Sequence, residues 1–357
     1  MASLRVGVLT FHRCINYGSY WQARCLVEGL RAMGHDAVLL DHVSARVNRR
    51  EWRCALQPQL PIRSLHEDVA AHSSKTRQFF EAFEKLPLSA AFPAENAGSA
   101  EGFDVVVVGS DEVWNLRHPW YGGYSLFYGE ALKTNRLVSY AASFGNHPAS
   151  HGLPDHWAGL LARFAALSVR DENSARIVRD SVGAEPELVL DPCLLFPQFI
   201  DAHPERVEAG KPYAAVYGHG FPRWFASAAR EWAASVGLRL VSVGYRNDWA
   251  DKQRIAAGPF EFARLMAGSV AVVTNFFHGC VFALLNAKPF ACVSSDYRAN
   301  KLRDLMHTAG TGRRLVTEAD PGNLPHLLGT PLAPEVRDRL GILRARSLDY
   351  LQGAIAP

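Results

Sequence analysis

Short apolar runs recur along the chain, and longer amphipathic segments separate them. The runs predict buried strands, and the amphipathic segments predict helices. In the first half, apolar runs lie at residues 6–10, 37–41, 103–109, 137–143 and 187–192. An amphipathic segment at 19–33 joins the first two, so the chain is expected to open with a right-handed β-α-β unit. Residues 44–100 are rich in Pro, Ala and charge, and they predict only a mixture of helix and loop.

A second series of the same kind begins near residue 211. It predicts strands at 213–217, 239–244, 270–274 and 289–293, and helices at 224–235, 259–266 and 281–285. Two alternating α/β series predict two Rossmann-like domains, 1–190 and 211–330, that face each other across a cleft. The amphipathic stretch 334–352 predicts a last helix, and the segment 334–357 is a candidate to fold back across the domains.

The composition changes this picture little. Of 357 residues, 48% are apolar and 20% charged, with a net charge of +3, which is typical of a soluble globular protein. No run of Lys or Arg is long enough to indicate binding to nucleic acid or to an anionic membrane. Six scattered cysteines without zinc spacing predict reduced, mostly buried thiols. With neither a signal peptide nor an apolar stretch that could span a bilayer, we expect a cytoplasmic protein.

The connection after the first predicted strand, residues 11–19, has the position of a phosphate-binding turn. It contains Arg13, Asn16 and Gly18, which are candidates for contact with a ligand. It is neither a G-x-G-x-x-G fingerprint nor a P-loop, so no nucleotide site is indicated. A structural interpretation is compatible with contact to a ligand. In it, Asn16 and Gly18 allow the backbone to turn, while Ser19 caps the following helix.

A group of polar residues follows the strand predicted at 103–109. Asp111 and Glu112 are candidates for a general acid or base, and Ser110 for substrate binding. Trp114 offers a surface on which a sugar ring could stack. The alternative is structural, because Ser110 or Asp111 at this position is also typical of a helix cap.

Arg170 stands where a short strand meets a new helix. A guanidinium at such a point can hold a phosphate or a carboxylate with two parallel hydrogen bonds. The alternative is a structural ion pair with Asp171 or Glu172. The position of the arginine alone does not separate the two interpretations.

The apolar run that ends at Thr274 leads within four residues to His278, and Gly279 follows at once. A histidine at the carboxyl end of a buried strand is a candidate for a ligand crevice, although a core histidine is the alternative. Lys301 follows the next strand and adds positive charge near the same edge, or else begins a solvated helix.

Eight segments in collinear order resemble the polysaccharide pyruvyl transferase family, and the likeness extends over roughly residues 5–315. The segments are 16–18 with Gln22, 109–115, 139–145, 168–171, 191–192, 277–279, 288–290 and 300–301. The resemblance implies a two-domain architecture like that of GT-B glycosyltransferases. It also implies transfer of pyruvate from phosphoenolpyruvate to a sugar or other hydroxylated acceptor as a ketal, with release of phosphate. Neither a cofactor nor a metal is expected.

The resemblance places Arg170 and His278 near phosphoenolpyruvate in the interdomain cleft. We expect Arg170→Ala and His278→Ala each to weaken its binding at least about tenfold while the fold survives. The chain departs from several members of the family at Phe276, where they carry an arginine; another branch commonly has a small polar residue there. The possible cationic substitutes are Arg13, Arg298 and Lys301.

The reaction implied by the resemblance needs an acid to protonate the methylene carbon and a base to take the acceptor proton. His278 is expected to bind phosphate or act as the acid, and Asp111 or Glu112 to act as the base. Two other functions remain open: a GT-B glycosyltransferase that uses a nucleotide-sugar, and a diverged binding subunit without catalysis. The sequence does not identify the acceptor or the oligomeric state.

Overall fold

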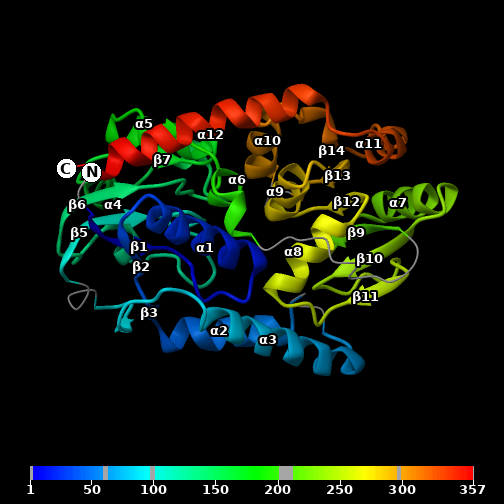
Figure 1. Cartoon of the computed structure of the whole chain (residues 1–357), viewed down its shortest axis with the longest axis horizontal. Helices are drawn as coiled ribbons and strands as arrows, with labels where there is room; N and C mark the ends of the chain where they lie inside the picture. Colours follow the sequence, from blue (N-terminus) through cyan, green and yellow to red (C-terminus); the bar gives the residue numbers. More distant parts are fainter. Residues whose placement is uncertain (1–2, 59–62, 97–100, 201–211, 296–298, 357) are drawn as a thin grey trace. The chain divides into compact units, whose positions relative to one another are not determined.

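The computed structural model describes residues 3–58, 63–96, 101–200, 212–295 and 299–356. The chain forms two compact units, and each is an α/β structure built on a parallel sheet (Figure 1). The first unit combines residues 1–51, 85–199 and 341–357, and the second combines 52–84 and 200–340. The prediction of two Rossmann-like halves is therefore confirmed. The predicted cleft between them stays a prediction.

The first unit is built on a four-stranded parallel sheet with the order β2-β1-β5-β6. Its strands are β1 (Arg5–Leu9), β2 (Asp36–Leu39), β5 (Phe103–Val108) and β6 (Thr134–Ser139). Helix α1 (Tyr17–Ala32) makes the expected crossover from β1 to β2. The central strand β5 pairs with β1 and β6, and it reads as a continuous valine run because side chains cover both of its faces.

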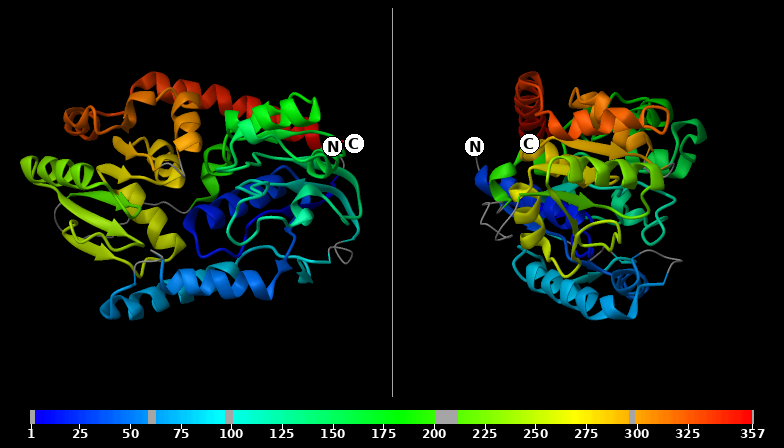
Figure 2. Two further views of the ribbon diagram at one scale, coloured as in Figure 1. Left: turned by 180° about the vertical axis from the view of Figure 1, so that it is seen from behind. Right: turned by 90° about the vertical axis from the view of Figure 1, so that its right-hand side faces the viewer.

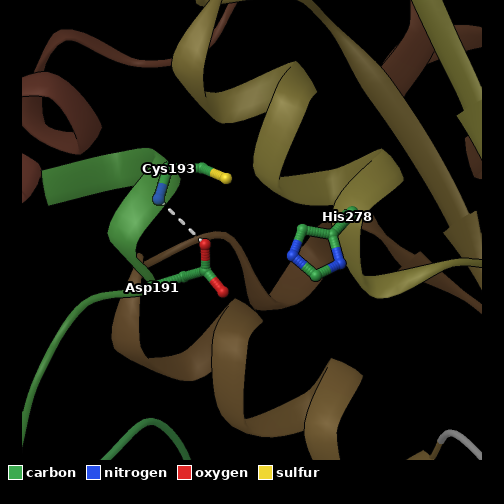
Figure 3. Close-up of side chains that lie close together, drawn as sticks. All are labelled: Asp191, Cys193 and His278. Carbon is green, nitrogen blue, oxygen red and sulfur yellow. Dashed lines mark hydrogen bonds between the residues drawn. The ribbon is translucent and has the colours of Figure 1, made fainter. Parts of the chain in front are cut away.

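Shorter elements complete the first unit around a core rich in aromatic side chains. They are β3 (His42–Val43), β4 (Phe92–Pro93), β7 (Ser168–Val169), β8 (Glu187–Leu188), α4 (Asp155–Leu161), α5 (Glu172–Val182) and α6 (Pro192–Leu195). The strand expected at 187–192 is short. Asp191 and Pro192 instead begin α6, because the Asp191 carboxylate accepts a hydrogen bond from the Cys193 amide at 3.0 Å (Figure 3).

The predicted C-terminal helix, α12 (Pro334–Ile355), is drawn in red in Figure 1. From Gly341 on, its described residues belong to the first unit. The Ser347 hydroxyl accepts a hydrogen bond from the Leu190 amide at 2.9 Å. Tyr350 donates to the Ser139 carbonyl at 2.9 Å. These two bonds attach α12 to the region beyond the strand ends of the first unit.

The second unit contains a six-stranded parallel sheet with the order β11-β10-β9-β12-β13-β14. The strands are β9 (Tyr213–Tyr217), β10 (Arg239–Val243), β11 (Lys252–Arg254), β12 (Ala271–Thr274), β13 (Phe290–Val293) and β14 (Leu315–Val316). The helices are α3 (Val69–Phe83), α7 (Arg223–Ser235), α8 (Pro259–Gly268), α9 (Phe277–Leu285), α10 (Ala299–Thr308) and α11 (Leu324–Gly329). Helix α2 (Ala45–Leu56) begins in the first unit and ends in the second.

Side chains on successive strand residues point to opposite faces of this sheet. Each face is covered by its own helices (Figure 2). Val216 and Val273 face the core formed with α7 and α11. Tyr217 lies on the other face, where its ring is 4.7 Å from that of Phe262 in α8. Phe262 in turn packs 4.9 Å from Phe282 in α9. Helices on both faces are what make a parallel sheet stable.

Residues 52–84 were predicted to belong to the N-terminal domain, but they belong to the second unit. In this segment, Lys75 donates from Nζ to the Gly244 carbonyl at 3.0 Å, and Gln78 donates to the Ala256 carbonyl at 2.7 Å. The domain boundary was misplaced because these partners lie far away in sequence.

Candidate functional site

Four polar side chains meet in the first unit just beyond the ends of β5, β7 and β8. We call them the Arg170 cluster: Ser110, Asp111, Arg170 and Asp191. The Arg170 guanidinium lies 3.2 Å from a carboxylate oxygen of Asp111 and 3.2 Å from one of Asp191. It also donates to the Ser110 hydroxyl at 3.4 Å. The Arg170 side chain is only 2% exposed, so these partners substitute for water.

The charge of Arg170 is compensated within this cluster. Burial alone would lower its pKa, but the nearby carboxylates of Asp111 and Asp191 outweigh burial and raise the pKa. The structural alternative predicted an ion pair with Asp171 or Glu172. In the structure, the ion-pair partners of Arg170 are Asp111 and Asp191 instead. Asp171 instead caps α5 and accepts from the Ser143 hydroxyl at 2.6 Å. An anionic ligand at Arg170 would have to share the guanidinium with two carboxylates.

Asp111 is held from several sides. One carboxylate oxygen accepts from the Ser19 hydroxyl at 2.7 Å, and the other accepts from the Glu112 amide at 2.9 Å. No helix follows β5 in the described residues around Asp111, so the helix-cap interpretation is wrong. The Glu112 carboxylate accepts from the Asn115 amide group at 2.9 Å. A Cβ at Gly145 would collide with that carboxylate, which explains the glycine.

Trp114 is not a stacking surface for a sugar, because its side chain is completely buried. Its indole N–H donates to the Phe127 carbonyl at 2.9 Å, and its ring packs 5.4 Å from that of Phe144. The indole therefore belongs to the core of the first unit. A buried tryptophan satisfies its one donor in this way.

In the loop at 11–19, Asn16 rather than Ser19 caps the helix. The Asn16 side chain accepts from the amides of Gly18 at 2.9 Å and Ser19 at 3.2 Å. The side chain of Ser19 turns to Asp111 instead. The cap already occupies these two amides at the N-terminus of α1. Contact between this loop and a ligand stays a prediction.

Arg13 forms an ion pair with Asp41 through two hydrogen bonds of 2.7 and 2.6 Å. His12, which sequence reasoning missed, lies 2.9 Å from the same carboxylate. Burial raises the pKa of Asp41, but the hydrogen bonds from His12 and Arg13 outweigh it and lower the pKa overall. Arg13 therefore already has an anionic partner, which weakens its case as a substitute cation. The only signal for His12 was its place in the first βα loop.

His42 packs edge-on against His12, and its Nε2 donates a hydrogen bond to the Thr10 carbonyl at 2.8 Å. Burial, with a smaller contribution from His12, lowers its pKa from 6.5 to about 3. The unfolded chain takes up this proton below about pH 6.5 and the folded chain only near pH 3. Stability should therefore fall as pH falls through this window, by up to about 1.4 kcal/mol per pH unit.

We expect His42→Gln to make the pH dependence of stability shallower between pH 6.5 and 4.5, since glutamine does not titrate. Urea unfolding at several pH values measures the slope. His156→Gln, at an exposed position of the same unit, is the control and should keep the wild-type slope. A slope of stability against pH that is the same in the His42 variant as in the wild type would show that His42 does not cause it.

In the second unit, His278 occupies the first turn of α9 rather than the tip of a strand (Figure 3). The helix begins at Phe277, four residues earlier than predicted. Gly279 has a packing role there, because a Cβ would collide with the Thr274 side chain. The Thr274 hydroxyl donates to the Tyr217 carbonyl at 2.6 Å, which fixes the strand end. Contact of His278 or Gly279 with a ligand stays a prediction.

Phe276 lies in an aromatic cluster at the carboxyl ends of β9, β10 and β12. Its ring centroid is 5.0 Å from that of Tyr217 and 5.3 Å from those of His219 and Tyr245. Edge-to-face contacts of this kind stabilise aromatic groups. A packed aromatic ring thus occupies the position at which several members of the family carry an arginine. Of the other cationic substitutes, Lys301 is partly buried in the first turn of α10, and Arg298 lies outside the described residues.

Comparison with solved structures defines the class of fold. A candidate UDP-N-acetylglucosamine 2-epimerase from Listeria monocytogenes has a TM-score of 0.52 and 12% identity over 98% of this chain and 96% of its own. The UDP-GlcNAc 2-epimerase from Methanocaldococcus jannaschii has a TM-score of 0.50 and 13% identity over 97% and 99%. These likenesses concern the fold alone, and the predicted GT-B-like class is confirmed.

A sequence profile of the polysaccharide pyruvyl transferase family matches residues 16–297. The chain therefore belongs to this family and is a transferase enzyme, as the resemblance implied. The match includes the Arg170 cluster and His278. None of the curated proteins compared with the chain matches it. Among the described residues, no helix has both the length and the apolar character needed to cross a membrane.

Proposed function

We propose that this transferase moves a pyruvyl group from phosphoenolpyruvate to two hydroxyl groups of a sugar. The methylene carbon gains a proton and becomes a methyl group. Two C–O bonds to the acceptor form, and the C–O bond to phosphate breaks. One hydroxyl proton ends on the methyl group and the other on the released hydrogen phosphate, so that atoms and charge balance. No metal is required, because general acids and bases move both protons.

The observation that carries this proposal is the family match, which extends over both units and includes His278. Phe276 precedes α9 without a side-chain capping bond, in contrast to Asn16 before α1. Helix N-terminal amides of this kind suit a phosphate group. A histidine in the same turn can add a hydrogen bond to that phosphate or deliver a proton. His278 is therefore assigned to phosphate binding or proton donation.

We assign the base to Asp111 or Glu112. Asp111 supports this role because Arg170 and Ser19 hold its carboxylate in place, and a fixed orientation favours proton transfer. Glu112 supports it through its bond to Asn115. Comparison of Asp111→Asn with Glu112→Gln distinguishes the two. The variant that loses turnover while it retains phosphoenolpyruvate affinity identifies the base.

Phosphate release with phosphoenolpyruvate and a panel of sugars tests the reaction. We expect release that depends on both substrates and that continues after treatment with a chelator. Thermal shift with phosphoenolpyruvate and with nucleotide-sugars is the second measurement, because a ligand of the native state raises the midpoint by mass action. No release across the panel, with stabilisation only by a nucleotide-sugar, would replace this proposal with glycosyl transfer. Loss of turnover with chelator would overturn the metal-free mechanism alone.

A further inference from the structure

Most of the large apolar side chains that are exposed in the described residues gather in one stretch of the chain. They are Trp52 (51% exposed), Leu56 (44%), Leu65 (46%), Val69 (44%) and Phe80 (42%). The others, Val236, Val270 and Ile342, lie singly in distant parts of the sequence. Single exposed apolar residues are ordinary, but a group of them marks an interaction surface.

Helix α2 shows how part of this group is presented to solvent. Val47, Glu51 and Ala55 recur every four residues and are buried, which defines the inner side of the helix. Trp52 and Leu56 lie on the outer side, again four residues apart. The Trp52 ring meets the ring of Phe80 in α3 edge-on, with centroids 6.4 Å apart, so the apolar surface extends beyond one helix.

The same outer side of α2 is strongly basic. Its exposed arginines are Arg46, Arg49, Arg50 and Arg53. The only acidic residue of the helix, Glu51, is buried and accepts a hydrogen bond from the Ile15 amide at 2.6 Å. Arg49 and Arg53 are one turn apart and adjoin Trp52 and Leu56 around the helix. We call these four residues the α2 face.

We propose that the α2 face binds the surface of an anionic membrane. Arginines together with tryptophan and leucine on one side of a helix are typical of helices that lie in the lipid–water interface. The arginines attract anionic headgroups, while Trp52 and Leu56 enter the boundary with the acyl chains. A second copy of this chain is a poor occupant, because a two-fold contact would bring like charges together. The proposal concerns where the enzyme works and does not depend on its reaction.

No run of basic residues in the sequence is long enough to indicate binding to a membrane. The four arginines at 46–53 are interspersed with Val, Asn, Glu and Trp, so they do not form a block. The helix separates them by burial: Glu51 and Val47 turn inward, while the arginines remain in solvent. The structure thus gives α2 an outer side on which every charged residue is an arginine.

Vesicle flotation with the full chain tests the proposal. Vesicles of phosphatidylcholine alone are compared with vesicles that contain about a third anionic phosphatidylglycerol. We expect the wild-type protein to float with the anionic vesicles and to remain in solution with the neutral ones. Arg49→Glu with Arg53→Glu should reduce the partition coefficient more than about tenfold, since each arginine near an anionic surface contributes several-fold. Trp52→Ser with Phe80→Ser should reduce it several-fold at unchanged charge.

The control is Arg303→Glu with Arg337→Glu, which makes the same change of charge at exposed positions outside the α2 face. It should leave the partition nearly unchanged, and circular dichroism verifies that every variant is folded. If the control and the Arg49 and Arg53 variant lose vesicle binding equally, the proposal is overturned in favour of a general charge effect. Absence of wild-type protein from anionic vesicles would also overturn it. A dimer that the α2 face variants disrupt would assign the surface to a second copy instead.

Discussion

His278→Ala should lower kcat/KM for phosphoenolpyruvate by about a hundredfold or more, with little effect on thermal stability. The side chain has the position of a phosphate ligand or proton donor in the first turn of α9, and loss of such a group typically reduces the rate by 10²–10⁴. Steady-state phosphate release measures the change. His307→Ala, at an exposed position in α10, is the matched control and should keep wild-type kinetics.

The kinetic parameters also separate the two roles of His278. If the imidazole binds phosphate in the ground state, His278→Gln should raise KM and partly retain kcat, because an amide can still donate a hydrogen bond. If it delivers the proton, the same substitution should lower kcat and leave KM nearly unchanged. Wild-type values in both His278 variants would remove the histidine from the site.

Arg170→Ala should lower the free energy of unfolding by about 3–5 kcal/mol, in addition to any effect on activity. The substitution leaves the carboxylates of Asp111 and Asp191 buried and close together without their cation. This expectation revises the one made from the sequence, that the fold would tolerate the change. Urea unfolding measures the loss. Asp111→Asn added to Arg170→Ala should recover part of it, because one uncompensated charge is then removed.

Arg179→Ala is the control for this experiment. Arg179 also pairs with a carboxylate, that of Glu185, through two bonds of 2.7 Å. That pair is exposed to water, which screens it, so its loss should leave the free energy of unfolding nearly unchanged. A similarly small effect at Arg170 would show that water or other groups compensate the buried carboxylates.

The strands could be predicted because burial on both faces leaves a direct trace in the sequence. Residues 213–217 were predicted as a strand and form β9, and the run at 103–109 contains β5. The end of a parallel strand is also visible, since the apolar run stops and polar residues begin. Arg170 and Asp111 were noticed for this reason, and the structure brings the two together.

What escaped prediction depends on contacts between distant residues. Trp114 follows a strand end like a ligand-binding residue, but Phe127 and Phe144 enclose it, and no local pattern indicates this. The partner of Arg170 was sought among neighbours in sequence, whereas Asp191 lies 21 residues away. Gly279 looked like a feature of a site, but its close approach to Thr274 offers a packing explanation.

The way in which the two units share the chain has a consequence for synthesis on the ribosome. The first unit needs residues after Gly341, whose hydrogen bonds reach Leu190 and Ser139, so it stays incomplete until α12 has emerged. The segment 52–84 emerges early but must wait for the strands of the second unit, made more than a hundred residues later. Neither unit can therefore mature alone, and the nascent chain must hold unpartnered apolar segments until α12 has been made.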